Sequence, residues 1–233
     1  MTSEQMNNTQ TPDTKIPEDA LIMVAVRDLV LFPGAIGPIA IARPKSIAAA
    51  QQALREQRPI GIVLQRNADV DDPGPDDLYR VATIANIVRY ITAPDGTHHI
   101  VCQGVQRARI LDFLPGTPFP VARIQQIPEP TTTSPEIEAR FLNLQRQAIE
   151  AIELLPQAPP ELIAMFQNTT SPGALADLAT STMDIKPQEK QEILETIDLS
   201  LRIEKVSKRL AERLEVLRIS NEIGQQTKAA FDE

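Results

Sequence analysis

The chain has 233 residues, 42% hydrophobic and 23% charged, which excludes wholesale disorder, a collagen-like chain and a pure coiled coil. The chain has only nine glycines, two histidines and one cysteine, the residues that phosphate-binding loops, metal sites and catalytic nucleophile–base pairs commonly use. A self-contained enzyme is therefore not expected. The 23 basic and 31 acidic residues give a net charge of −8, which repels a phosphate backbone and disfavours nucleic acid as a partner. The length fits one large domain or two modest ones, and we predict two.

The first 19 residues are polar and show no hydrophobic periodicity, so residues 1–19 are predicted to be a disordered tail. This segment also lacks the apolar core of an export signal. No window approaches the roughly 18 uninterrupted apolar residues of a membrane-spanning helix. Because Cys102 has no partner within the chain, a reducing compartment is compatible, and we expect a cytoplasmic protein without membrane contact.

Residues 20–128 contain short apolar runs typical of strands and are predicted to form a β domain. The predicted strands lie at 21–26, 39–41, 60–64, 81–92, 99–103, 107–114 and 120–127. Asp95 and Gly96 favour the positive φ angles of a type I′ turn, so the strands on either side of them should pair antiparallel. One amphipathic helix is expected at 44–57, with Pro44 in its first turn.

A proline- and threonine-rich linker is predicted at residues 129–133, and a helical subdomain at 134–197. Ser134 and Ser171 each precede a proline, as N-cap residues often do. The predicted helices lie at 135–155, 160–167, 172–181 and 187–196.

A long C-terminal helix is predicted from residue 198 to 233. It carries an apolar stripe of Ile203, Val206, Leu210, Leu214 and Leu217. This stripe must be buried, either against the chain's own helices or against a neighbouring subunit. Gly224 could end the helix as a C-cap, but the residues after it favour continuation, so we expect the helix to continue into a module that the chain does not contain.

The motifs of a P-loop, a G-x-S-x-G nucleophile elbow and an H-E-x-x-H zinc site are all missing from the sequence. His98 and His99 are adjacent, so in a strand they point to opposite faces and cannot bind one metal together. Cys102 is interpreted as a small buried hydrophobe. We therefore predict no catalytic, cofactor-binding or metal-binding residues in this chain.

Two groups of charged residues are interpreted as ordinary surface features. The acidic loop at residues 69–77 lacks the spacing of a calcium-binding loop and is expected to be solvated. The basic residues Arg43, Lys45, Arg107 and Arg109 are expected on a solvated or salt-bridged face.

Several ordered blocks resemble the N-terminal region of Lon proteases, over roughly residues 18–233. The blocks are Val26–Gly34 (VRDLVLFPG), Arg43–Ile47 (RPKSI), Asp77–Ala85 (DLYRVATIA), Pro94–Thr97 (PDGT), Gly104–Ile110 (GVQRARI), Leu175–Ala179 (LADLA) and Lys186–Gln191 (KPQEKQ). Their matching order makes the resemblance more specific than any single motif.

The resemblance implies an α+β fold: a PUA-like mixed β barrel or sheet with one or two helices, followed by an all-α subdomain that ends in a long helix. It also implies the substrate-recognition and assembly-supporting front end of a hexameric ATP-dependent serine protease, which degrades misfolded and regulatory proteins. The ATP- and Mg²⁺-binding AAA+ module and the Ser-Lys dyad of that family have no matching positions here. We therefore expect a non-catalytic N-terminal portion, natural or engineered.

Unfolded or degron-bearing proteins are the partners that this resemblance implies. Phe32, Pro33 and Ile36 are candidates for apolar substrate contacts, and Arg43 and Lys45 for contacts with acidic or backbone groups. Core packing is the alternative for Phe32. The stripe of the long helix is the candidate for oligomer or inter-helix packing.

Two other functions remain open at this point. A free-standing adaptor with a LON domain would recruit partners, although it would not need the extensive helical tail. An RNA-binding protein is suggested by the PUA-like fold, but the acidic charge opposes it.

Overall fold

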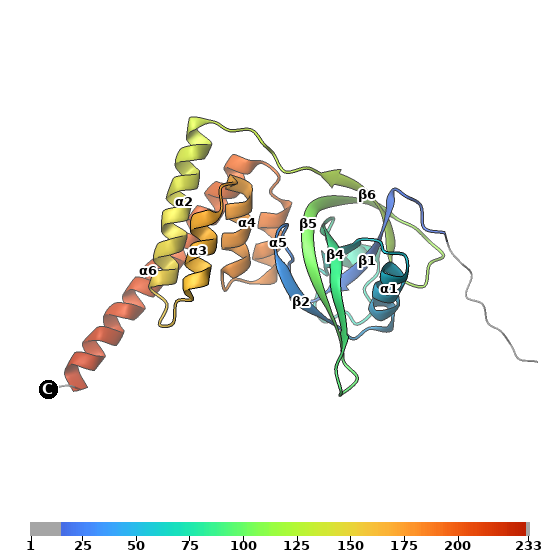
Figure 1. The fold of residues 1–233 in the computed structure, drawn as a ribbon, viewed down its shortest axis with the longest axis horizontal. Helices are drawn as coiled ribbons and strands as arrows, with labels where there is room; N and C mark the ends of the chain where they lie inside the picture. Colours follow the sequence, from blue (N-terminus) through green and yellow to red (C-terminus); the bar gives the residue numbers. More distant parts are fainter. Residues whose placement is uncertain (1–14, 232–233) are drawn as a thin grey trace, which may run out of the picture.

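The structure is a computed structural model that describes the backbone of residues 15–231 and the side chains of residues 15–227. A β domain is followed by a bundle of helices, and one long helix extends beyond the bundle (Figure 1). The β domain comprises β1 (Ala20–Val26), β2 (Ile36–Ile41), α1 (Pro44–Arg55), β3 (Ile60–Leu64), a short 3-10 turn η1 (Pro75–Asp77), β4 (Val81–Thr92), β5 (His98–Phe113) and β6 (Val121–Ile127). The predicted α+β class is confirmed.

The six strands form one mixed sheet that closes on itself. The strand order is β2-β5-β4-β3-β1-β6, and β6 pairs with β5 as well as with β1. Five strands therefore form a closed barrel, while β2 extends from β5 and has one unpaired edge. β1 and β3 run parallel, and the other pairs are antiparallel.

The two strands predicted at 99–103 and 107–114 form the single strand β5, with Gly104 inside it. The loop after β1 lies directly on this glycine. The Gly34 N–H donates to the Gly104 carbonyl, and the Gly104 N–H donates to the Ala35 carbonyl, both at 2.9 Å. A Cβ atom at Gly104 would overlap the Phe32 carbonyl. The glycine therefore permits close approach of this loop rather than ending a strand.

The predicted antiparallel pairing of β4 and β5 is confirmed, but the predicted type I′ turn is wrong. Gly96 has a φ of 85°, whereas Gln57 is the one described non-glycine residue with a positive φ. The Ala93 carbonyl accepts from the Gly96 N–H at 2.9 Å, and the Ala93 N–H donates to the Thr97 carbonyl at 2.8 Å. This is the longer hairpin loop in which a glycine bulge closes the turn.

Part of the predicted disordered tail differs from the structure. Residues 1–14 lie outside the described residues. Ile16 is buried in the core, and Arg58 donates to the carbonyls of Ile16 and Pro17 at 3.3 and 3.1 Å. Hydrogen bonds from the Arg58 side chain therefore hold residues 16 and 17 in place before β1. The polar composition of this segment did not predict such a contact.

The helical domain, residues 134–231, agrees closely with the predicted helices. It contains α2 (Pro135–Glu153), α3 (Pro160–Asn168), α4 (Pro172–Thr182), α5 (Pro187–Glu195) and α6 (Leu199–Phe231). Ser134 Oγ accepts from the Ile137 N–H at 3.2 Å, and Ser171 Oγ accepts from the Ala174 N–H at 3.4 Å, so both predicted N-caps are confirmed.

Helix α6 continues past Gly224, as its composition indicates. Its apolar stripe packs within the chain, mainly against α2 and α4. Ile203, Val206, Leu210 and Leu214 are buried, and Leu217 is half-buried. The stripe thus serves inter-helix packing, while the following residues up to 227 are exposed and extend beyond the bundle (Figure 1).

The two domains share one hydrophobic core. The largest buried cluster runs from Ile22 and Val24 of β1 through Phe32 to Leu194 and Ile203 of the helical domain. The alternate β1 residues Leu21 and Met23 belong to a second, smaller cluster, so β1 is buried on both faces. The two predicted domains therefore pack directly against each other.

Candidate functional site

A buried ionic junction joins the β domain to the helices. Arg107 of β5 makes a bidentate pair with Asp177 of α4, with N···O distances of 2.8 and 2.7 Å. The two side chains are only 1% and 3% exposed. Arg202 of α6 pairs with Glu129 at 2.8 Å, and Glu129 also reaches Arg107 at 3.3 Å. We call these four residues the ionic junction.

Backbone carbonyls satisfy the remaining donors of the junction. Arg107 Nε donates to the Leu194 carbonyl at 2.9 Å, and Arg202 Nε donates to the Thr196 carbonyl at 2.8 Å. Burial lowers the pKa of Arg202, and the nearby Arg107 lowers it further, whereas Asp177 and Glu129 oppose this change. Two positive and two negative groups thus balance, as buried charges require. Arg107, Arg202 and Asp177 are buried, while the Glu129 side chain is 36% exposed at the edge of the junction.

This junction corrects part of the prediction for Arg107 and adds a role for one residue of the predicted linker. Arg107 was expected on a solvated or salt-bridged face; it is salt-bridged, but it is buried between the domains. Glu129 falls in the predicted linker 129–133, yet its carboxylate binds both arginines. Sequence could not reveal either role, because Asp177 lies 70 residues after Arg107 and Glu129 lies 73 residues before Arg202, although only 22 residues separate Glu129 from Arg107.

A groove of about 420 Å³ opens beside the junction, between the two domains. The loop at residues 32–36 forms one wall, and α3 and α4 form the other. The helical wall includes Leu162, Met165, Thr169, Ala174, Asp177, Leu178, Ser181 and Thr182. Asp177 belongs to both the groove and the ionic junction. We call this feature the interdomain groove.

Three of the predicted substrate-contact residues line this groove, but in different ways. Ile36 is 63% exposed and Pro33 is half-buried, so both present apolar surface to solvent. Phe32 is 1% exposed, which corrects its assignment: it packs in the core and supports the loop. Across the groove, Met165 of α3 is 52% exposed, and sequence analysis missed it. Its position in a short helix gave no signal that it would face the loop.

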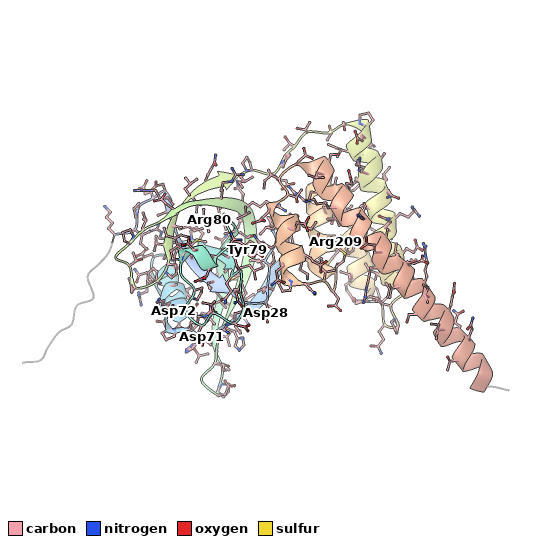
Figure 2. The ribbon with its side chains drawn as sticks, turned by 180° about the vertical axis from the view of Figure 1, so that it is seen from behind. Asp28, Asp71, Asp72, Tyr79, Arg80 and Arg209 are labelled. Carbon is pink, nitrogen blue, oxygen red and sulfur yellow. The ribbon has the colours of Figure 1, made fainter. Side chains whose placement is uncertain are left out.

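Arg43 and Lys45 lie away from the groove, where Arg43 contacts Gln65 after β3 and Lys45 contacts the acidic loop. Arg43 Nη2 donates to Gln65 Oε1 at 2.5 Å, and Lys45 Nζ contacts both carboxylate oxygens of Asp72, at 2.7 and 2.8 Å. Figure 2 shows Asp71 and Asp72 on the β domain, while Arg209 marks α6 in the helical domain. The structure therefore does not bring the five predicted contact residues together.

Two further side chains with potential reactivity are Cys102, which is buried, and His98, which contacts Tyr90. Burial raises the pKa of the Cys102 thiol to about 12, so this thiol stays protonated. Tyr90 Oη lies 2.9 Å from His98 Nδ1. Within residues 15–231, no His, Cys, Asp and Glu side chains form a group of three that could hold a metal ion. None of the helices described has both the length and the apolar character needed to cross a membrane.

A closed barrel packed on a helical bundle, with an open, largely apolar groove between them, is thus the architecture of this chain. The chain belongs to the family of the ATP-dependent protease La (LON) substrate-binding domain, whose model matches residues 20–212.

Relatives with similar sequences are Lon proteases. The chain is 54% identical over 216 residues to the Lon protease of Methylocella silvestris, which covers 93% of this chain and 27% of that protein. It is 52% identical over 219 residues to the Lon protease of Phenylobacterium zucineum, covering 94% of this chain and 28% of that protein. The chain thus corresponds to the N-terminal region and spans about a quarter of the length of these relatives.

Solved structures with the same fold are also N-terminal domains of this family. The N-terminal domain of Mycobacterium avium complex Lon protease matches with a TM-score of 0.69 at 22% identity, over 84% of this chain and 98% of that one. The Lon N-terminal domain protein from Xanthomonas campestris matches with a TM-score of 0.58 at 14% identity, over 80% of this chain and 96% of that one. Because both sequence identities are below 25%, these matches show a shared fold only.

Proposed function

We propose that this chain is the substrate-recognition region of an ATP-dependent Lon protease and that the interdomain groove holds apolar segments of unfolded proteins. The observation that carries this proposal is the exposed apolar pair of Ile36 and Met165 on opposite walls of one groove. Folded proteins hide such segments, so apolar contacts distinguish an unfolded chain from a folded one.

The polar groups of the groove suit an extended backbone. Thr169, Ser181 and Thr182 each donate their hydroxyl hydrogen to a carbonyl of the local helix backbone, at 2.7, 2.8 and 3.0 Å. Each hydroxyl oxygen therefore keeps acceptor capacity but has no free donor. Such a wall can accept hydrogen bonds from the main-chain N–H groups of a bound polypeptide. Because nearly every residue has such a group, the apolar content of the polypeptide, rather than one specific sequence, would determine how tightly it binds.

The other expectations for this chain belong to the same proposal. The buried ionic junction supports a rigid link from the groove to α6, through which bound substrate would be presented to an ATPase module. ATP and Mg²⁺ would act in that module, and this chain would bind substrate without cleaving it. A cytoplasmic hexamer is the assembly that we propose for the whole protease.

The test is binding of fluorescein-labelled β-casein, an unfolded protein, measured by fluorescence anisotropy. The double variant Ile36→Ser/Met165→Gln removes the two exposed large apolar side chains of the groove, one from each wall. At roughly 25 cal/mol per Å² of apolar area, the loss is about 1–2 kcal/mol, so we expect Kd to rise about 5- to 30-fold. The melting temperature should change little because both side chains are largely exposed.

The matched control is Val88→Ser/Leu111→Ser, which removes two apolar side chains of similar exposure, 61% and 55%, outside the groove. This control should bind β-casein like the parent chain. Equal affinities for all three proteins, or an equal loss in both double variants, would exclude the groove as the binding site.

A further inference from the structure

The strand β2 has one edge that no other strand covers. It lies at the end of the sheet order and pairs with β5 alone. Gly104 of β5 directs its N–H and its carbonyl toward residues 34 and 35, just before β2. Because main-chain groups alternate between the two sides of an antiparallel strand, residues 37, 39 and 41 of β2 face β5. The residues whose main-chain groups face the free edge are Ile36, Pro38 and Ala40.

The free edge offers hydrogen-bonding groups that no hydrogen bond among the described residues uses. Ile36 and Ala40 each present an N–H and a carbonyl there, and Pro38 presents a carbonyl only. Pro38 supports this arrangement, because a proline inside a sheet places its nitrogen, which has no hydrogen, on the unpaired side. All three residues are exposed. An exposed strand edge of this kind is a template for pairing with another extended chain.

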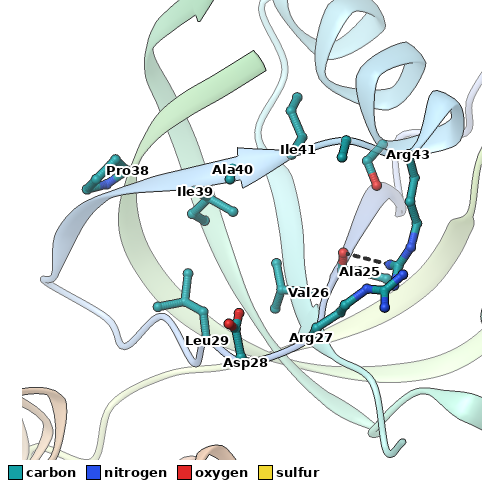
Figure 3. A pocket seen from close by; sticks show the side chains of 12 residues that line it. Ala25, Val26, Arg27, Asp28, Leu29, Pro38, Ile39, Ala40, Ile41 and Arg43 are labelled. Carbon is teal, nitrogen blue, oxygen red and sulfur yellow. Dashed lines mark hydrogen bonds between the residues drawn. The ribbon is translucent and has the colours of Figure 1, made fainter. Parts of the chain in front are cut away.

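A cavity of about 480 Å³ runs along this edge (Figure 3). Five consecutive residues, 38–42, line it on the side of β2, and five consecutive residues, 25–29, line it at the end of β1 and in the following turn. Successive side chains of a strand point to opposite faces, so a cavity that touches consecutive residues lies along the edge of the strand. We call this cavity the edge slot. Arg43 and Ser46 complete its lining where α1 begins.

The edge slot combines main-chain polar groups with apolar side chains. Val26 and Ile39 are buried and Leu29 is half-buried, so apolar side chains lie beside the polar edge of β2. An extended polypeptide has the same two components, because its main-chain groups point sideways while alternate side chains point to one face. A strand with apolar residues at alternate positions therefore matches both components of the slot.

The position of the edge slot favours an unfolded polypeptide over a second copy of this chain. Residues 25–29 lie across the slot from β2. The β2 edge of another copy carries the same wall in front of it, so two such edges could not approach each other closely, whereas a single extended segment has no such wall. In addition, Ile36 is the first residue of β2 and also lines the interdomain groove. A polypeptide held in the groove therefore lies directly at the start of the free edge.

We propose that the free edge of β2 binds an extended segment of the substrate polypeptide as an added β strand. The segment has apolar side chains at alternate positions and no proline at the positions that pair, because each of these must donate an N–H. It is about five residues long, like the wall formed by residues 38–42. This inference deepens the proposed function and rests on it only for the identity of the occupant as a substrate.

The test uses a fluorescein-labelled heptapeptide of alternating valine and threonine, preceded by two lysines for solubility, and measures its binding by fluorescence anisotropy. Two analogues replace the amide with an ester at alternate residues, one at the valines and one at the threonines, which removes N–H donors with little change of shape. Because only alternate N–H groups of a strand face one edge, one analogue should bind at least tenfold more weakly than the parent peptide and the other should stay within about threefold. Equal affinities of the two analogues, or no binding of the parent peptide at about 1 mM, would overturn the proposal.

A variant that gains affinity locates the binding within the protein. Pro38→Ala adds the missing N–H to the free edge, so the parent peptide should bind about 2- to 10-fold more tightly, a gain that loss of structure cannot produce. Pro118→Ala is the matched control: it removes an exposed proline of the β domain outside the slot and should leave the affinity unchanged. An unchanged or weaker affinity in a folded Pro38→Ala protein would contradict the added strand. The ester comparison uses the parent chain, so it remains valid if Pro38→Ala disturbs β2.

The outcome is distinguishable from that of the groove experiment. The variant Ile36→Ser/Met165→Gln keeps the main chain of β2, and neither side chain lines the edge slot, so it should bind the heptapeptide normally. Unequal ester analogues together with unchanged β-casein binding in this variant would refute the groove alone. Equal ester analogues together with weakened β-casein binding would refute the added strand alone.

Discussion

The ionic junction provides a quantitative test of how the two domains are held together. Replacing Arg107 with methionine keeps much of the side-chain volume but removes the guanidinium from a pair that is almost fully buried. Asp177 would then remain buried without its bidentate partner. Breaking a buried pair in this way typically destabilises a protein by about 3–5 kcal/mol.

The lower end of this range is expected here, because Arg202 stands 3.7 Å from Asp177 and compensates part of the lost interaction. A loss of about 3 kcal/mol corresponds to a decrease in melting temperature of about 6–12 °C for a domain of this size. Urea and thermal unfolding followed by circular dichroism measure both quantities.

Two controls separate this explanation from a general effect of removing an arginine. Arg109→Met removes an exposed arginine from the same strand and should change stability by no more than about 0.5 kcal/mol. Arg107→Met/Asp177→Leu removes both partners and should recover part of the loss. A loss below about 1 kcal/mol in Arg107→Met, or no recovery in the double variant, would refute the reasoning.

Three further predictions concern single residues. Gly104→Ala should cost about 1–3 kcal/mol because the new methyl group meets the Phe32 carbonyl, whereas Gly37→Ala, which enters open space, should stay within about 0.5 kcal/mol; urea unfolding measures both. Cys102 should resist iodoacetamide at pH 8 in the native state and react once urea unfolds the chain, as mass spectrometry would show; fast native labelling would contradict its burial. The Lys186 N–H, aided by Arg209, holds the pKa of Glu189 below its usual value. Its stabilising contribution is therefore present above the ordinary carboxyl pKa and lost as the pH falls through the lowered value. Replacing Glu189 with glutamine should make the free energy of unfolding less dependent on pH between about pH 5 and 3, and an unchanged slope would contradict this.

Local signals were sufficient for most of the secondary structure. Helix starts and strands can be predicted without the tertiary fold where their signals come from residues close in sequence. Such signals are the N-caps Ser134 and Ser171, the prolines in the first turns of the helices, and the apolar runs of β1 and β3. Gly104 misled the strand prediction, because a glycine that ends a strand and one that admits another backbone look the same in sequence.

The candidate sites could be predicted only in part. Pro33 and Ile36 were identified as exposed apolar residues, but the wall that faces them comes from α3, more than 120 residues later. Arg43 was identified as a notable cation, yet its hydrogen bond to Gln65, 22 residues later, depends on the fold that brings α1 beside the end of β3. Phe32 was a candidate for substrate contact with core packing as the alternative, and the fold places it in the core.

The sequence by itself determined the element order, the α+β class, the continuation of α6 past Gly224 and the family resemblance, because these follow from periodicity, capping and ordered local motifs. Only the tertiary structure decided that Arg107 is buried against Asp177, that the stripe of α6 packs within the chain, and that a groove lies between the domains. The physical reason is that burial and charge pairing depend on residues far apart in the chain, whose approach is set by the packing of the complete core.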